Sequence, residues 1–291
     1  MSGPSSGSAD LSRLGQWVPC APFTIERSRI MQYAAATNDL TPAHREGRAA
    51  NPVFAVLPAW PTLFPLLRST LVGRDTARAL HGAHDITLHG PLTPGVDLVT
   101  RAAIVGAAPT STGMTITGRA TSEAADGGLL VDQYMTVIVQ GLTIPEAVGY
   151  GAPPRPGEEI PLFAEPRPLG SSTLDQDQTQ RYARASGDRE AIHLDPVVAR
   201  QAGFPGVINH GNCTFAVAAQ HVLSATCSPD TSRLRRIAVR YAHPVLPPQT
   251  VTTRKLGEVH TPEGAAVSWD AVRRGGRPCL SRGYALVCPT S

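Results

Sequence analysis

The sequence lacks the features that define several large classes of protein. Its 291 residues include five cysteines, an odd number, and no Cys-x-x-Cys pair. We therefore expect neither a disulfide framework nor a zinc site, and we predict no metal and no cofactor. No glycine-rich phosphate loop stands at a strand-to-helix junction, which argues against nucleotide binding through such a loop. No window approaches 18 consecutive apolar residues, so no transmembrane helix and no membrane partner are expected.

The N-terminal residues and the charge balance argue against further classes of protein. Residues 1–11 are rich in serine and glycine without an apolar centre, which predicts a disordered tail, not a signal peptide. The cysteine pattern, with no expected disulfides, predicts a reducing, cytoplasmic environment. Charged residues make up only 17% of the chain, Lys255 is the sole lysine, and the net charge is +3. No basic cluster is interleaved with aromatics, so we expect no nucleic-acid partner. Mild basicity suits an anionic, phosphate-bearing substrate.

The densest basic patch is Arg233, Arg235 and Arg236. We interpret it mainly as a solvated loop that precedes a strand. The alternative is that these arginines contact the phosphates of a carrier similar to coenzyme A.

A proline-rich segment divides the chain. Seven prolines fall between residues 143 and 172, and because proline fixes φ and lacks an N–H, we expect neither helix nor central strand there. The sequence thus predicts an N-terminal domain over residues 12–142, a linker over 143–172 and a C-terminal domain over 173–291.

The two halves repeat the same landmarks. In each half a tyrosine is followed six residues later by an aspartate and eleven residues later by a histidine. These landmarks are Tyr33, Asp39 and His44 in the first half, and Tyr182, Asp188 and His193 in the second. Further along, residues 88–94 parallel residues 241–247. Three landmarks in one order indicate a duplication.

Each half has the same expected order of elements. A short helix (28–36 or 177–185) precedes the Asp-x4-His loop, and in the second half a helix that is apolar nearly all round follows at 210–223. Strands rich in β-branched residues come next, at 85–88, 97–105, 114–123 and 129–139, and at 234–241, 250–258, 265–274 and 282–287. Helices and strands do not alternate, so the pattern favours an α+β fold with an antiparallel sheet wrapped round a buried helix.

The second Asp-x4-His loop combines the groups needed to add water beside a thioester. A base must activate water at the β-carbon, an acid must protonate the α-carbon, and an N–H must stabilise charge on the thioester oxygen. Asp188 and His193 can supply acid and base, and Gly211, at the expected helix start, can offer its N–H without a side chain in the way. The competing interpretation is structural: Asp188 as an Asx-turn residue, His193 as an ordinary core or surface histidine, and His210 as a helix cap.

A longer motif carries a family resemblance. The stretch Tyr182-Ala-x-x-Ser-Gly-Asp188-x4-His193-x-Asp-Pro, continuing to His210-Gly211, resembles the signature of the MaoC-like, or R-specific enoyl-CoA hydratase 2, family. The first half is similar to the degenerate N-terminal repeat of the double-hotdog members. The resemblance therefore covers nearly the whole chain.

The resemblance implies two hotdog repeats joined as a pseudo-dimer. It implies that Asp188 and His193 activate water, that the Gly211 N–H binds the thioester oxygen, and that the first repeat accommodates the acyl chain without catalysis. The residues expected to bind substrate or support the site are Tyr182, Ser186, Gly187, Glu190, His210 and Asn212.

Two departures from the family pattern stand out. The family carries Asn-Pro where this chain has Glu190-Ala191, so a second carboxylate lies beside Asp188 and would raise the pKa of one of the two if both were buried. In the first half, residues 58–61 (Pro-Ala-Trp-Pro) replace the His-Gly pair. We therefore expect no oxyanion donor there, and a vestigial Asp39 and His44.

The leading hypothesis is a hydratase or dehydratase, a hydro-lyase that interconverts a trans-2-enoyl thioester and a (3R)-3-hydroxyacyl thioester of coenzyme A or an acyl carrier protein. One alternative is a tailoring dehydratase of polyketide-type secondary metabolism. Another is a non-catalytic acyl-thioester binding subunit of a hetero-oligomer. We expect a monomeric pseudo-dimer or a homodimer.

Overall fold

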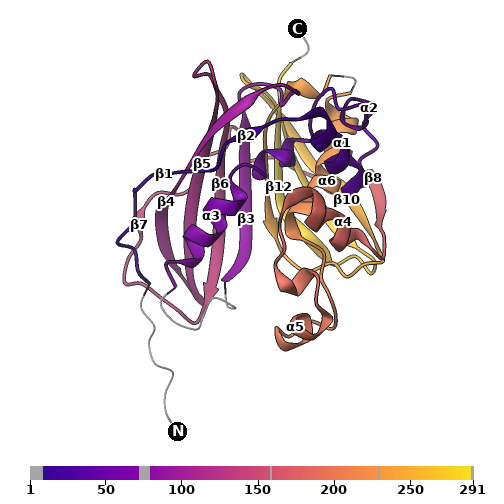
Figure 1. Ribbon diagram of the computed structural model, residues 1–291. Coiled ribbons are helices and arrows are strands. Elements are labelled where there is room, and N and C mark those ends of the chain that lie inside the picture. The colour runs from indigo at the N-terminus through magenta and orange to yellow at the C-terminus, as the bar shows by residue number, and fades with distance from the viewer. Residues whose placement is uncertain (1–8, 72–78, 158, 229, 290–291) are drawn as a thin grey trace.

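One antiparallel sheet of 12 strands runs through the part of the chain that the structure, a computed structural model, describes: residues 9–71, 79–157, 159–228 and 230–289. The predicted N-terminal tail falls largely in residues 1–8, outside the described residues. Figure 1 shows the strands of the first half, purple to magenta, on the left and those of the second half, orange to yellow, on the right. The predicted α+β class is confirmed. No helix in the described ranges is long and apolar enough to cross a membrane.

Within the described residues, the first half supplies four long strands and four short helical segments. The strands are β3 (Ala79–Leu88), β4 (Asp97–Thr110), β5 (Gly113–Ala124) and β6 (Leu129–Gln140), with the two-residue strands β1 (Val18–Pro19), β2 (Phe23–Thr24) and β7 (Val148–Gly149) paired to β4. The helical segments are α1 (Arg27–Ala36), α2 (Pro42–Arg45), the 3-10 helix η1 (Pro52–Val56) and α3 (Trp60–Arg68). The predicted helix at 28–36 and the four predicted strands are confirmed.

The second half follows the same order with a longer central helix. Its helical segments are α4 (Gln178–Ser186), the 3-10 helix η3 (Ala191–His193), α5 (Pro196–Gln201), α6 (Gly211–Thr226) and the 3-10 helix η4 (Thr231–Arg233). Its strands are β8 (Leu162–Leu174), β9 (Leu234–Tyr241), β10 (Gln249–Thr261), β11 (Gly264–Arg273) and β12 (Pro278–Val287). The predicted helices at 177–185 and 210–223 and the four predicted strands lie within a few residues of these bounds.

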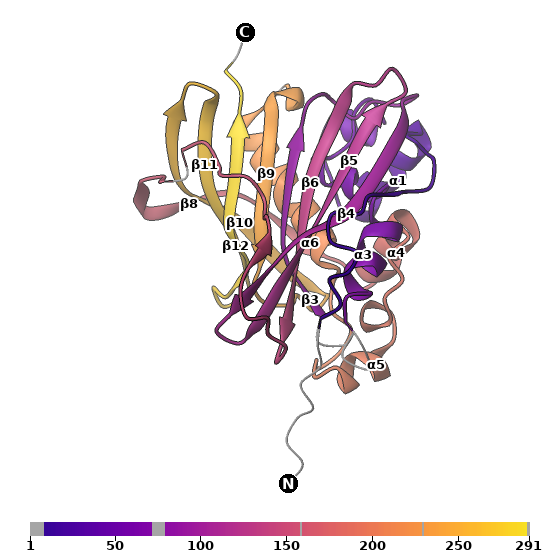
Figure 2. The ribbon, with the colours of Figure 1, turned by 90° about the vertical axis from the view of Figure 1, so that its left-hand side faces the viewer.

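The two halves are joined at the β3–β9 pair. The strand order is β1-β4-β5-β6-β3-β9-β12-β11-β10-β8, and Ala83 to Thr87 of β3 pair antiparallel with Arg240 to Arg236 of β9. Figure 2 shows the two sets of strands running on into one another across this seam. The hydrogen-bonded ladder is therefore continuous between the repeats.

The largest hydrophobic cluster surrounds α6 and draws on both halves. From Asn212 to Leu223 every residue of α6 is buried, as its apolar sequence predicts. Residues of β9 to β12 contribute to this cluster, but so do Val53 to Leu57 and Ile86 of the first half. A second cluster joins α3 to the inner face of β4, β5 and β6. The helix that carries the predicted oxyanion donor is thus held by a core that both repeats build.

Part of the segment predicted as a linker, residues 143–172, belongs to the sheet, although its described residues form neither a helix nor a central strand, as the prolines predict. Strand β8 begins at Leu162 and includes Pro166 and Pro168. It lies at the edge of the sheet and pairs only with β10, so its outer N–H groups need no partner in a ladder, and proline is tolerated there. The segment before β8 is fixed from outside: Arg236 donates to the carbonyls of Pro153 and Pro154.

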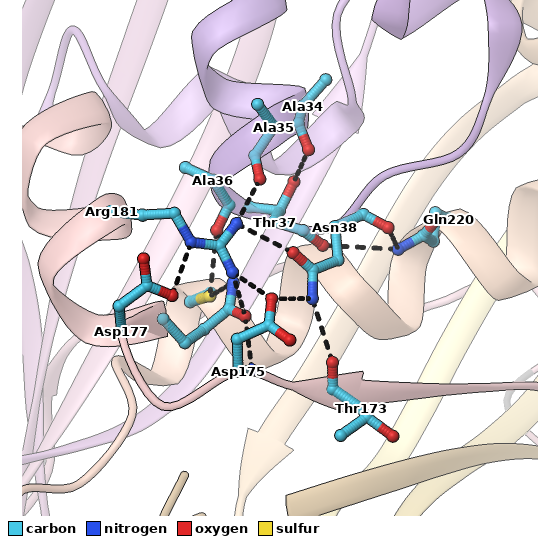
Figure 3. A network of polar contacts seen from close by, with 12 residues as sticks. Ala34, Ala35, Ala36, Thr37, Asn38, Thr173, Asp175, Asp177, Arg181 and Gln220 are labelled. Carbon is cyan, nitrogen blue, oxygen red and sulfur yellow. Dashed lines mark hydrogen bonds and ion pairs between the residues drawn. The ribbon is translucent and has the colours of Figure 1, made fainter. Parts of the chain in front are cut away.

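A polar network fastens α1 to α4 across the halves (Figure 3). Arg181 of α4 donates to the carbonyl of Ala35 at 2.7 Å and to Asn38 Oδ1 at 3.0 Å, and it pairs with Asp175 and Asp177. Asn38 in turn donates to the carbonyl of Thr173 at 2.9 Å. This network fixes the end of α1 against the start of α4, the helix that leads into the candidate site.

Candidate active site

The loop that carries Asp188 begins where α4 ends. Gly187 adopts a φ of +79°, a left-handed conformation that glycine adopts without strain and that turns the chain sharply. The Ser186 hydroxyl donates to the Tyr182 carbonyl and accepts the N–H of Asp188 at 3.1 Å. Ser186 and Gly187, both predicted site residues, therefore shape the turn that aims the Asp188 carboxylate inward, where Asp188 is only 6% exposed.

A single turn of 3-10 helix brings His193 to the same point. The N–H of Glu190 donates to Asp188 Oδ1 at 3.2 Å, and the Glu190 carbonyl accepts the N–H of His193 at 3.0 Å. The ring of buried His193 donates from Nδ1 to the carbonyl of Ile208 at 2.8 Å. Because this hydrogen bond holds the proton on Nδ1, Nε2 carries the free lone pair.

His210 lies between these groups and the central helix. Its Nε2 donates to the backbone carbonyl of Asp188 at 3.1 Å, and its ring stacks on His193 with centroids 3.9 Å apart. The centroid of the Tyr182 ring lies 4.9 Å from that of the His210 ring. Four predicted residues, two from the Asp188 loop, one from α4 and one at the N-cap of α6, thus meet in one buried cluster.

Burial sets the charge states of this cluster. Desolvation raises the pKa of Asp188 to about 7, aided by the nearby charge of Glu190 and opposed by the Glu190 N–H. Desolvation also lowers the pKa of His193 to about 4 and that of His210 to about 2, the latter helped by its histidine neighbour. At neutral pH both imidazoles are therefore uncharged, while Asp188 is divided between its acid and its carboxylate.

Gly211 is the first residue of α6. Its N–H points out of the helix without an intrahelical partner, at the positive end of the helix dipole. A Cβ on Gly211 would lie 3.0 Å from Cε1 of Tyr241, so the Tyr241 ring would have to move by a few tenths of an ångström to admit it. Tyr241 itself donates to Asn212 Oδ1 at 2.6 Å. Asn212, predicted to support the site, therefore holds the Tyr241 ring beside Gly211, the predicted oxyanion donor.

The cluster has the residue types of a metal site but not the orientation. One ligand atom each from Asp188, His193 and His210 lie within 4.8 Å of one another, and His210 Nδ1 has no partner among the described residues. However, an imidazole binds a metal in its own ring plane, and the two rings are stacked with an interplanar angle of 29°. Their lone pairs lie in nearly parallel planes, so this arrangement does not suit one shared ion.

Glu190 does not point into the cluster. Its carboxylate pairs with Arg68 of α3, whose Nη1 lies 2.9 Å from Oε1 and 3.0 Å from Oε2. Sequence reasoning missed Arg68, together with Ile208 and Tyr241. No local pattern marks Arg68, which is 122 residues from its partner. Tyr241 stands in the stretch that repeats residues 88–94, which was the available signal for it.

The first half also contains an aspartate–histidine pair, but its neighbours differ from those of Asp188 and His193. His44 Nδ1 lies 2.8 Å from Asp39 Oδ2, and Asn51 donates to the same oxygen at 2.8 Å. The helical start that faces this dyad is η1, not the segment 58–61 considered above. There Pro52 has no N–H, and the N–H of Val53 donates to Asn51 Oδ1 at 3.0 Å. The Pro52 and Val53 positions therefore present no free donor beside the dyad.

The basic patch lies at the start of β9, and its side chains contact protein groups. Buried Arg236 makes two hydrogen bonds with Asp85, at 2.7 and 2.9 Å, and Arg233 donates to the carbonyl of Cys288. Arg235, exposed, donates to the carbonyl of His89. The predicted solvated loop is therefore wrong for Arg235 and Arg236, which lie in β9, and buried Arg236 is unavailable to a phosphate.

Comparisons with known proteins follow this division of the chain. A family described as "MaoC like domain" matches residues 155–259, and one described as "FAS1-like, dehydratase domain region" matches residues 12–132. Residues 155–259 thus form a MaoC-like dehydratase domain, residues 12–132 match a dehydratase region, and the fold is the double hotdog.

Three curated relatives illustrate the range. A "Probable enoyl-CoA hydratase 2" of Dictyostelium discoideum is 28% identical over 58% of this chain and 56% of its own length. "Peroxisomal multifunctional enzyme type 2" of Mus musculus is 31% identical over 74% of this chain and 28% of its own. "3-hydroxyacyl-thioester dehydratase Y" of Mycobacterium tuberculosis is 31% identical over 62% of each. The chain thus spans between about a quarter and under two thirds of these relatives.

Solved structures share the fold. A MaoC-like dehydratase of Phytophthora capsici superposes with a TM-score of 0.78, covering 97% of this chain and 100% of that one at 21% identity. A Mycobacterium tuberculosis protein described as a double hotdog fold superposes with a TM-score of 0.60, covering 94% and 96% at 13% identity. At these identities the likeness concerns the fold alone.

Proposed function

We propose that this protein is a hydro-lyase that interconverts a trans-2-enoyl thioester and a (3R)-3-hydroxyacyl thioester. The observation that carries the proposal is one buried cluster in which Asp188 and neutral His193 lie beside the free N-terminus of α6 at Gly211. The names of the relatives support the same chemistry. The carrier would be coenzyme A or an acyl carrier protein.

In the hydration direction His193 acts as the base. Its Nε2 lone pair takes a proton from water as the water oxygen bonds to C3 of the enoyl group. The electron pair of the C2–C3 double bond moves toward the thioester oxygen, where the Gly211 N–H and the positive end of α6 stabilise the charge. The carboxyl of Asp188 then delivers its proton to C2. The proton held on His193 returns to Asp188 and restores the starting state.

This division of labour follows from the two shifted pKa values. A base must be unprotonated and an acid protonated at the same pH, and here burial lowers the pKa of His193 to about 4 and raises that of Asp188 to about 7. The reverse reaction uses the other distribution of the same single proton, with Asp188 removing the C2 proton and His193 protonating the leaving hydroxyl. Both directions should therefore show kcat/KM profiles with limbs near these two values.

Substitutions in the two matching dyads test the proposal. Asp188→Asn and His193→Ala should each abolish hydration of crotonyl-CoA or a longer enoyl thioester while circular dichroism shows a folded protein. Asp39→Asn, in the first-half dyad that faces no free N–H, is the matched control and should keep activity. Turnover near that of the wild type in either second-half variant would refute the assignment. Loss of activity in folded Asp39→Asn would contradict a vestigial first site.

A specific observation favours a second candidate. Glu190-Ala191 stands where the family has Asn-Pro, and Glu190 is committed to Arg68 at the edge of the site. This favours a tailoring dehydratase that acts on an unusual β-hydroxy thioester. A panel of simple enoyl-CoA substrates separates the two, because rapid turnover supports the general hydratase and silence supports the tailoring enzyme.

The non-catalytic subunit is the weakest of the three hypotheses. A binding subunit has no use for a carboxyl and an imidazole whose pKa values burial shifts in opposite directions. A purified chain that is active alone would exclude it. A cytoplasmic location, a monomeric or homodimeric state, and the acyl-accommodating role of residues 12–142 stay predictions.

A further inference from the structure

An ion pair connects the first half to the loop of the candidate site. Arg68, in the last turn of α3, places Nη1 within 3.0 Å of both carboxylate oxygens of Glu190. The side chains are 30% and 39% exposed, so water reaches the pair only partly. An exposed pair of this kind contributes little to global stability. Its position gives it another role.

The backbone of Glu190 touches both proposed acid/base residues. Its N–H holds Asp188 Oδ1 at 3.2 Å, and its carbonyl accepts the N–H of His193 at 3.0 Å. A displacement of this one residue therefore changes the position of the carboxyl and of the imidazole together. For a proton transfer, misplacement by about 1 Å is enough to cost a large factor in rate.

Helix α3 is a firm support for the arginine. Its buried leucines pack on β4 and β5, and Arg68 lies over the Phe64 ring at 5.5 Å. Phe64 stacks on Trp60 with centroids 4.6 Å apart. These contacts restrict the arginine before it meets Glu190, so less conformational freedom is lost when the pair forms.

The same helix also reaches the oxyanion side of the site. Trp60 lies 5.9 Å from the ring of His81, which lies 4.2 Å from the ring of Tyr241, the residue packed on Gly211. A row of aromatic contacts thus leads from α3 to the oxyanion donor, while Arg68 leads from α3 to the acid/base loop. Helix α3 is therefore connected to both parts of the site, the acid/base loop and the oxyanion donor.

We propose that Arg68 and Glu190 form an inter-repeat latch that positions the Asp188–His193 loop, so that the first repeat supplies a working part of the second repeat's active site. The consequence for catalysis rests on the proposed hydration chemistry. The latch itself is a statement about the loop and is testable without turnover. Both members are positioning residues, since neither lies among the reacting groups.

The charges of Arg68 and Glu190 should also affect the pKa of Asp188. Neutral His193 and His210 and the uncharged phenol of Tyr182 surround Asp188. The carboxylate of Glu190 points away to Arg68 but lies near enough for its charge to raise the pKa of Asp188, and Arg68 balances that charge. Removing Arg68 would leave the Glu190 charge unbalanced and favour the protonated acid of Asp188. Removing the Glu190 charge would favour the ionised form. A merely structural pair would not move the pH profile in opposite directions.

A double-mutant cycle with crotonyl-CoA tests the catalytic consequence. Arg68→Met and Glu190→Gln should each lower kcat roughly threefold to tenfold with KM nearly unchanged, and the double variant should be no worse than the poorer single variant. The alkaline limb of kcat/KM should move up in Arg68→Met and down in Glu190→Gln. Arg68→Lys should recover most of kcat, because one nitrogen makes both contacts. Arg101→Met, which breaks the Arg101–Glu123 pair on β4 and β5, is the matched control and should change nothing.

Amide hydrogen exchange tests the latch without reference to activity. The amides of Glu190 and His193 should exchange faster in Arg68→Met and Glu190→Gln than in wild type, and at the wild-type rate in Arg68→Lys and Arg101→Met. Unchanged exchange at these amides overturns the latch, as does an additive cycle with an unmoved pH limb. If wild type hydrates no enoyl thioester, the proposed function fails, and the exchange rates alone decide about the latch.

Discussion

Replacing Asp188 by asparagine should stabilise the protein at alkaline pH. Asp188 is 6% exposed, and its burial raises the pKa from 3.8 to about 7. When folding raises the pKa of a carboxyl, the folded protein accommodates the protonated form better than the ionised form. That contribution to stability is lost as pH rises from the unfolded value near 4 to the folded value near 7. Asparagine has nearly the same shape, carries no charge, and can accept the Glu190 N–H as Asp188 does.

The size of the effect follows from the shift in pKa. About three units at roughly 1.4 kcal/mol each give up to about 4 kcal/mol of stability that wild type forgoes above pH 7. At pH 5 the native carboxyl is still protonated, and the penalty is smaller by about 2–3 kcal/mol. The advantage of Asp188→Asn over wild type should therefore widen by about that amount between pH 5 and pH 8.

Urea denaturation followed by circular dichroism at the two pH values measures this difference. Asp39→Asn is the matched control, because hydrogen bonds from His44 and Asn51 outweigh desolvation and lower the pKa of Asp39. That substitution should destabilise the protein at pH 8. A stability gap between Asp188→Asn and wild type that is the same at both pH values would refute the reasoning, and so would destabilisation by Asp188→Asn at pH 8.

Three further predictions concern separate features. Gly211→Ala should reduce kcat/KM by at least about tenfold in a folded protein, because its Cβ would lie 3.0 Å from the Tyr241 ring and obstruct the N–H; assays on crotonyl-CoA check this. Asp85→Asn should cost about 3–5 kcal/mol in urea denaturation, since it breaks the buried pair with Arg236 at the seam of the sheet. Acidification from pH 6.5 to pH 4 should lower the urea midpoint. Over most of this range the buried histidines, whose pKa values are lowered, stay neutral in the folded protein but bind protons in the unfolded chain, which favours unfolding. These histidines are His84, His193, His210 and His221.

Local patterns in the sequence predicted much of the fold and the centre of the site. The β-branched runs gave β4 to β6 and β9 to β12 with small errors at their ends, gave only the end of β3, and missed β8. The all-round apolar run gave α6, because its burial on every side is visible in composition alone. That Asp188 and His193 meet in the candidate site could be predicted since they share one short loop, and that His210 joins them since it precedes a helix that the pattern marks.

What the sequence did not predict depends on contacts between distant segments. The edge position of β8, which makes its prolines tolerable, is a property of the whole sheet. The guanidinium of Arg68 comes to the site through tertiary packing, and nothing in its neighbourhood indicates it. Ile208 lies within the motif that ends at His210-Gly211, but the pattern does not show that its carbonyl would hold His193. The first-half site was located at the wrong segment because η1 interrupts the repeat before α3 begins.

The continuous sheet across β3 and β9 has a consequence for how this molecule can vary. In a homodimer of single hotdogs every substitution is made twice, so a proline that removes an N–H at one site removes it at both. Here the two dyads lie in one polypeptide, and under the proposed function Pro52 leaves one without an N–H donor while Gly211 provides a donor at the other. Freed from symmetry, the first copy can devote α3 and Arg68 to serving its neighbour, a division of labour that identical subunits could not encode.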